Sequence, residues 1–117
     1  MTRVLVVEDE LSLREALVND LQIAGHNVVQ CANGREAMAA LEASDPRFAW
    51  LFTDIRLAGL LDGWAIADRA RALNPEVLVV YAMASSDDKP KKLPGSRHVA
   101  KPYDAAVVLG HFAELAG

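Results

Sequence analysis

The sequence predicts one α/β domain of the doubly wound (βα)5 type, a three-layer sandwich with a five-stranded parallel sheet between two layers of helices. Short apolar runs alternate five times with segments that fit a helix. The runs lack the alternating polarity of a strand with one solvated face, so strands buried on both faces are expected. Right-handed crossovers between such strands produce the sandwich. A chain of 117 residues has room for one core of this kind, so residues 1–117 are expected to form a single domain.

Each strand and helix has its own basis in the sequence. The strands are the apolar runs, at residues 4–7, 26–31, 48–53, 77–82 and 97–100. Helical spacing of apolar residues follows at residues 13–24, 37–41, 64–73 and 105–115. Residues that favour helix starts are Ser12, Asn33 and Asp104. Residues that favour helix ends are Gly25, Ser44-Asp45-Pro46 and Asn74-Pro75. The fourth helix is predicted to be shortened to about one turn, because Pro90 and Pro94 lie in its segment.

Composition and charge narrow the class of function. The net charge of −4 argues against direct contact with nucleic acid, which calls for a basic face. The single cysteine, Cys31, cannot form an internal disulfide, so a reducing, cytoplasmic setting is expected. No segment contains the ~18 consecutive apolar residues that a membrane-spanning helix needs, and no membrane contact is expected.

Charged side chains gather where the predicted strands end. Glu8 and Asp9 follow the first strand, Asp54 follows the third and Lys101 follows the fifth. Because parallel strands end at one edge of a sheet, these side chains are expected to lie together. Three carboxylates at that distance repel one another unless a cation is present, and oxygen ligands favour Mg²⁺. A carboxylate beside Mg²⁺ is suited to accept a phosphoryl group, which Lys101 would contact.

Three segments resemble the receiver domain of two-component response regulators, over essentially the whole chain: residues 4–10, residues 52–56 with Asp62-Gly63, and Lys101-Pro102-Tyr103. The resemblance implies a sheet of strand order 2-1-3-4-5. It implies phosphotransfer to Asp54 from a histidine kinase or a histidine phosphotransfer protein. By the same resemblance, Asp9, Asp54 and the Arg56 backbone carbonyl would bind Mg²⁺, with Glu8 nearby or acting through water.

Two positions depart from the pattern of this family. Receivers usually carry Thr or Ser just after the fourth strand, where this chain is aligned with Met83. They usually carry Tyr or Phe in the fifth strand, where this chain has His98. The hydroxyl and the aromatic ring act as a switch in the family, so phosphorylation is expected to be retained while its conformational readout is atypical.

Other functions stay open. A pseudo-receiver would act as a phosphorylation-independent interaction or dimerisation module. A phosphatase with an Asp nucleophile would need two acids two residues apart on its first strand; Glu8 and Glu10 have that spacing, but Glu is the wrong nucleophile. No enzymatic activity is expected beyond phosphotransfer to the domain itself and its dephosphorylation. Output is expected through a downstream protein partner or a fused output domain, and homodimerisation is left open.

Overall fold

A computed structural model describes residues 2–43, 47–84 and 93–117. Its strands are β1 (Arg3–Val7), β2 (Asn27–Cys31), β3 (Trp50–Asp54), β4 (Leu78–Met83) and β5 (Ser96–Ala100). They form one sheet of order β2-β1-β3-β4-β5, and every pairing is parallel. The α/β class that the sequence predicted and the strand order that the family resemblance implied are confirmed.

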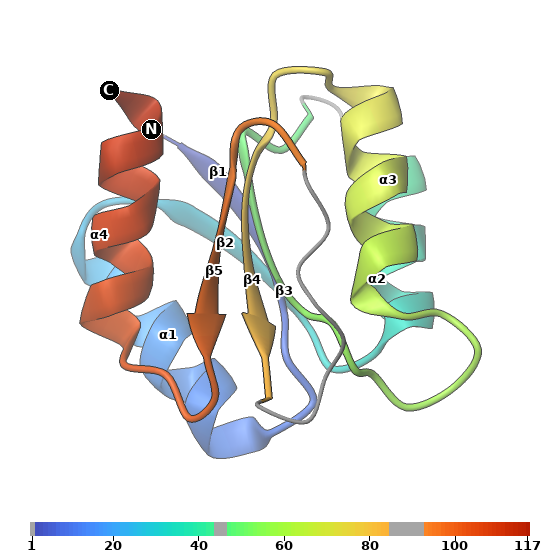
Figure 1. Cartoon of the computed structure of the whole chain (residues 1–117), viewed down its shortest axis with the longest axis horizontal. Coiled ribbons are helices and arrows are strands. Elements are labelled where there is room, and N and C mark those ends of the chain that lie inside the picture. Colours follow the sequence, from blue (N-terminus) through green and yellow to red (C-terminus); the bar gives the residue numbers. More distant parts are fainter. Residues whose placement is uncertain (1, 44–46, 85–92) are drawn as a thin grey trace.

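Two layers of helices enclose the sheet. The helices within the described residues are α1 (Leu11–Ile23), α2 (Gly34–Ala43), α3 (Gly63–Leu73) and α4 (Ala105–Ala116). Figure 1 shows α1 and α4 on one face of the sheet and α2 and α3 on the other. The shortened helix expected after β4 falls mostly on residues 85–92, which lie outside the described residues.

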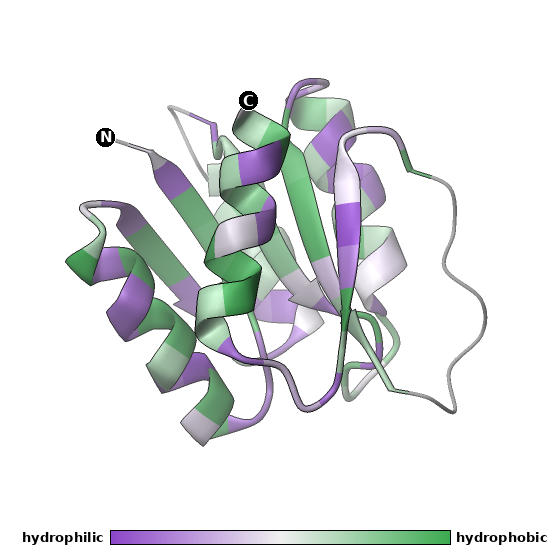
Figure 2. Cartoon of the chain, turned by 60° about the vertical axis from the view of Figure 1, so that its left-hand side comes forward, coloured by the Kyte–Doolittle hydropathy of each residue, from purple (hydrophilic) through white to green (hydrophobic). Residues whose placement is uncertain are grey.

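The core consists of two apolar clusters, one on each face of the sheet. Along β1, Val4 and Val6 belong to the cluster beneath α1 and α4, whereas Leu5 and Val7 belong to the cluster beneath α2 and α3. All four side chains are fully buried. This two-sided burial explains why the run has no alternating polarity. The inner strands are accordingly mostly green in Figure 2, whereas the edge strand β5 is largely white and purple and the helices mix green with purple.

The start of α1 differs from the prediction. The helix begins at Leu11, and its N-cap residue is Glu10, whose side chain makes no capping hydrogen bond. The predicted cap, Ser12, lies inside the first turn and donates from Oγ to Glu10 Oε1 at 3.2 Å. The Glu10 N–H instead donates to Glu8 Oε2 at 3.1 Å. The prediction was wrong because α1 begins at Leu11, one residue before Ser12, so Ser12 cannot be its N-cap.

Other helix starts follow the usual chemistry of N-caps. Asn33 Oδ1 accepts from the Glu36 N–H at 2.8 Å, and Asp104 Oδ1 accepts from the Ala106 N–H at 3.0 Å. Both predicted caps are thus confirmed. Asp62 also caps α3, because its Oδ1 accepts from the Ala65 N–H at 2.9 Å. This cap was not predicted from the sequence, where Asp62 stands out only as part of the Asp62-Gly63 motif.

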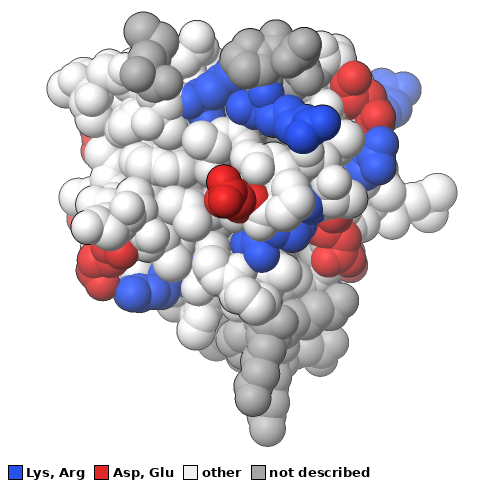
Figure 3. Space-filling view, turned by 90° about the horizontal axis from the view of Figure 1, so that it is seen from above, with Lys and Arg blue, Asp and Glu red and all other residues white. Residues whose placement is uncertain are grey.

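The amino and carboxyl ends of the parallel strands differ in the charged side chains that surround them. Figure 3 looks from above in the orientation of Figure 1, onto the amino ends of the strands, where basic and acidic side chains are interspersed. Glu8, Asp9 and Asp54 gather at the opposite, carboxyl ends of the strands. Among the described residues, no helix has both the length and the apolar character needed to span a bilayer.

Candidate functional site

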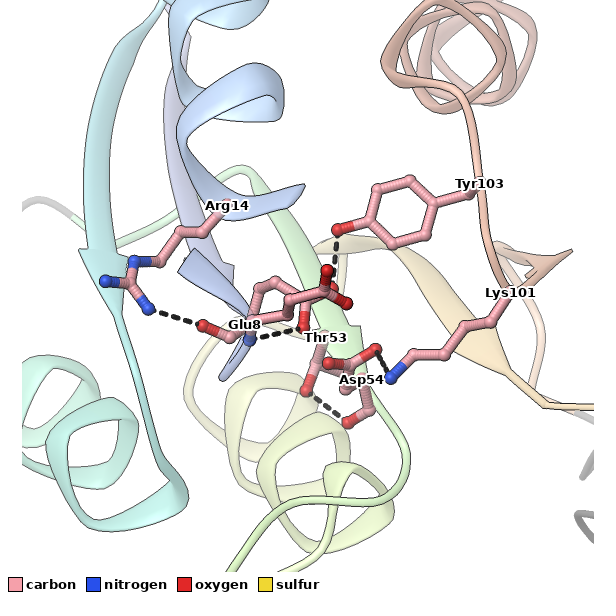
Figure 4. Close-up of polar contacts among 7 residues, drawn as sticks. Glu8, Arg14, Thr53, Asp54, Lys101 and Tyr103 are labelled. Atoms are coloured by element: carbon pink, nitrogen blue, oxygen red, sulfur yellow. Dashed lines mark hydrogen bonds and ion pairs between the residues drawn. The ribbon is translucent and has the colours of Figure 1, made fainter. Parts of the chain in front are cut away.

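Side chains from separate segments converge at the carboxyl edge of the sheet. Glu8 and Asp9 follow β1, Asp54 is the last residue of β3, and Lys101 directly follows β5. One carboxylate oxygen from each of the three acids lies within 4.8 Å of the others. Lys101 Nζ lies 2.8 Å from Asp54 Oδ1. The structure therefore brings together the four side chains that the sequence placed at this edge. Figure 4 shows three of them, Glu8, Asp54 and Lys101.

The backbone around Asp54 is held tightly. The Thr53 hydroxyl donates to the Asp54 carbonyl oxygen at 2.8 Å, and the Gly63 N–H donates to the Ile55 carbonyl oxygen at 2.8 Å. A Cβ atom at position 63 would lie 2.0 Å from the Asp54 carbonyl oxygen. Only glycine allows the start of α3 to approach the end of β3 this closely, which explains the Asp62-Gly63 motif.

The Asp54 carboxylate is fully buried. Lys101 forms an ion pair with Oδ1, but within the described residues neither carboxylate oxygen accepts a well-directed hydrogen bond. Buried polar atoms normally have such partners, and an unpaired one is costly. Two buried oxygens with unused lone pairs, next to two further carboxylates, are suited to a hard cation, so the residues present fit Mg²⁺.

The environment of Asp54 disfavours its charged form when no cation is bound. Burial raises the pKa of Asp54, the adjacent Glu8 carboxylate raises it further, and Lys101 offsets this only in part, so that the pKa is about 8. For Lys101, burial opposes the charged form, but Asp54, Glu8 and Asp9 outweigh it and raise the pKa of the ammonium. The Lys101 ammonium therefore stays positively charged whether Asp54 is protonated or ionised.

Glu8 is also fully buried, and its carboxylate is held from two sides. The Tyr103 hydroxyl donates to Oε1 at 2.6 Å, and the Glu10 N–H donates to Oε2 at 3.1 Å. Burial alone would raise the pKa of Glu8, but its interaction with the adjacent Asp54 carboxyl group and the hydrogen bonds from Tyr103 and the Glu10 N–H lower it below its ordinary value. As the pH rises, Glu8 therefore ionises before Asp54.

The remaining predicted residues take different positions. Asp9 is exposed and contributes an oxygen to the acidic cluster. Arg56 is exposed, two residues beyond Asp54. Its role through the backbone carbonyl stays a prediction.

The two atypical switch positions lie on neighbouring strands. Met83 is the last residue of β4, and its side chain is buried in the core on the α2–α3 face. His98 is exposed on β5, and its ring stacks on Tyr81 with centroids 5.9 Å apart. Their assignment as switch positions stays a prediction. The stacking of His98 on Tyr81 was not foreseen, although their register in adjacent strands is the feature that would have indicated it.

The fold and the acidic edge define a receiver domain. A family model described as the response regulator receiver domain matches residues 4–110. The chain belongs to this family, the receiver domains of two-component systems.

Known relatives agree with this assignment. The chain is 33% identical over 81 residues to the response regulator receiver protein CpdR of Brucella abortus, covering 69% of this chain and 65% of that protein. It is 33% identical over 85 residues to the C4-dicarboxylate transport transcriptional regulatory protein DctD of Rhizobium meliloti, covering 72% of this chain and 18% of that one. The chain thus spans less than two thirds of the length of either relative.

Solved structures show the same fold. A response regulator receiver protein from Sinorhizobium medicae superposes with a TM-score of 0.84 at 26% identity, over 97% of this chain and 93% of that one. The receiver domain of the hybrid histidine kinase CckA superposes with a TM-score of 0.79 at 23% identity, over 98% of this chain and 99% of that one. At that identity, the second likeness concerns the fold alone.

Proposed function

We propose that this receiver accepts a phosphoryl group on Asp54 from a histidine kinase or a histidine phosphotransfer protein, with Mg²⁺ as cofactor. One observation carries the proposal. The fully buried Asp54 carboxylate has no well-directed hydrogen bond within the described residues, yet it is paired with Lys101 and lies against two further acids. A purely structural carboxylate in the same position would be expected to have its lone pairs satisfied.

The oxygen-rich edge supports a metal-assisted reaction. Asp9, Asp54 and the Arg56 carbonyl would hold Mg²⁺, which supplies positive charge against the phosphoryl oxygens. A carboxylate oxygen of Asp54 attacks the phosphorus of a phosphohistidine, a new P–O bond forms, and the P–N bond breaks. The imidazole leaves with the electron pair of that bond. Lys101 then pairs with a phosphoryl oxygen as a point charge.

Water ends the signal by hydrolysing the aspartyl phosphate, which returns the Asp54 carboxylate and releases inorganic phosphate. No other enzymatic activity is proposed. The readout uses an atypical switch at Met83 and His98, and it reaches a downstream protein or a fused output domain through protein contacts.

A phosphorylation-independent pseudo-receiver is the second candidate. The observation in its favour is the burial of Met83 in the core, where it offers no hydroxyl to a phosphoryl group. The two candidates differ in whether Asp54 is modified at all.

Incubation with acetyl phosphate and Mg²⁺, followed by intact-mass spectrometry, separates the two candidates. The wild-type protein is expected to gain one phosphoryl group, and Asp54→Asn is expected to gain none. Omission of Mg²⁺ should suppress the adduct in the wild type. Asp68→Asn, which neutralises an exposed acid on α3, is the matched control and should be modified normally. An unmodified wild-type protein at millimolar Mg²⁺ would favour the pseudo-receiver.

A further inference from the structure

Tyr103 contacts the acidic site from a segment that supplies none of the acids. It lies in the connection between β5 and α4, directly before Asp104, the N-cap of α4. Figure 4 shows its side chain reaching from that connection to Glu8, on the opposite side of the site from Arg14. The 2.6 Å contact between the Tyr103 hydroxyl and Glu8 Oε1 joins residues that are 95 positions apart in the chain.

Both ends of this contact are held in place. The Tyr103 ring packs on the Phe52 ring of β3, with centroids 5.0 Å apart at an interplanar angle of 55°. The Glu8 main chain is fixed by Arg14, whose guanidinium donates to the Glu8 carbonyl oxygen at 2.8 Å. The hydroxyl therefore meets a carboxylate whose position is already restricted, so the hydrogen bond decides the orientation of the carboxylate group.

Hydrogen bonding distinguishes the two buried acids, Glu8 and Asp54. Both oxygens of Glu8 accept hydrogen bonds, one from Tyr103 and the other from the Glu10 N–H. Asp54 accepts no well-directed hydrogen bond within the described part of the chain. An acid with both oxygens engaged is suited to orient a metal-bound water, whereas an acid with unused lone pairs is suited to bind the metal directly.

We infer that Tyr103 is a positioning residue of the Mg²⁺ site, whose hydroxyl holds the Glu8 carboxylate beside the metal as an outer-sphere acid. This inference rests on the proposed function of Asp54 and adds a residue to it. The Tyr103 hydroxyl keeps the charge of Glu8 close to the cation. It also restricts the motion of the Glu8 side chain before the cation binds. Loss of such an outer-shell partner typically weakens metal binding.

Calorimetric titration with Mg²⁺ tests the inference in a double-mutant cycle. Tyr103→Phe keeps the ring and removes only the hydroxyl, and it is expected to weaken Mg²⁺ binding about tenfold, at the lower end for an outer-shell partner. In a Glu8→Gln background, Tyr103→Phe should alter the Mg²⁺ affinity by less than about twofold, because the side chain that the Tyr103 hydroxyl positions no longer carries a charge. Ser12→Ala, which removes another hydroxyl near the Glu8–Glu10 segment without a contact to Glu8, should leave the affinity unchanged.

The outcomes separate the two levels of the proposal. If Tyr103→Phe binds Mg²⁺ like the wild type, or weakens binding equally in both backgrounds, the inference is overturned while the proposed function stands. If the wild-type protein binds no Mg²⁺ and forms no phosphoryl adduct, the proposed function fails, and the inference fails with it. Urea unfolding of each variant in EDTA shows whether a change in affinity comes from lost stability; a stability loss that accounts for the whole change would also overturn the inference.

Discussion

Without divalent cations, the protein is expected to become less stable as the pH rises from about 4 to about 8. The pKa of Asp54 is 3.8 in an ordinary setting and about 8 in the folded protein, since burial and then Glu8 disfavour its charge. The folded state therefore binds more protons than the unfolded state in this interval, and its stability falls by up to ~1.4 kcal/mol for each pH unit. The total loss should reach several kcal/mol. Glu8, whose pKa is lowered, acts in the opposite sense only at the acidic end.

Urea unfolding followed by circular dichroism between pH 5 and pH 8, in EDTA, measures this loss. Asp54→Asn, which carries no titrating group at this position, should remove most of the slope and be more stable than the wild type at pH 8. The exposed-site control Asp68→Asn should retain the wild-type slope. Mg²⁺ should stabilise the wild type more at pH 8 than at pH 5, because a cation replaces the proton on Asp54. A slope that is the same in wild type and Asp54→Asn would show that Asp54 is not the group responsible.

Gly63→Ala is expected to destabilise the protein by about 3 kcal/mol, the upper end for steric insertion into a packed interior. The added Cβ would lie 2.0 Å from the Asp54 carbonyl oxygen and 2.8 Å from both the Asp54 carbonyl carbon and the Ile55 Cα. These are backbone atoms, which cannot turn aside as a flexible side chain can. Relief requires α3 and the end of β3 to separate, so Asp54 should also be displaced and its phosphorylation by acetyl phosphate slowed.

Gly110→Ala is the matched control for this substitution. Gly110 is exposed within α4, and a Cβ there would meet nothing within 4 Å. Alanine favours a helix over glycine, so this variant should be more stable by about 0.5–1 kcal/mol. Urea unfolding of both variants gives the comparison. If the two substitutions change stability alike, the close approach of α3 to Asp54 is not what requires glycine at position 63.

The fold and the four charged residues of the site were accessible from the sequence for one physical reason. Strands buried on both faces are continuous apolar runs, and parallel strands end at a common edge. Acids after the runs at residues 4–7 and 48–53, and a lysine after the run at residues 97–100, therefore had to meet. The strand order itself came from the family resemblance, and the sheet confirms it.

The remaining features depend on geometry that spacing does not encode. Ser12 has the chemistry of an N-cap, but the hydrogen bond from the Glu10 N–H to Glu8 sets where α1 begins. Tyr103 was visible only as part of a motif, because its reach to Glu8 depends on the path of the connection from β5 to α4. The pKa of Asp54 depends on its burial and on its distance from Glu8, neither of which the sequence states.

The central claim is that Asp54 itself carries the phosphoryl group. The most direct measurement is reductive trapping: borohydride converts an aspartyl phosphate to homoserine, and peptide mass spectrometry then locates the altered residue. After treatment with acetyl phosphate and Mg²⁺, we expect homoserine at position 54 of the wild-type chain and the ordinary aspartate at position 9. Homoserine at position 9 or at any other aspartate, with position 54 unaltered, would contradict the claim.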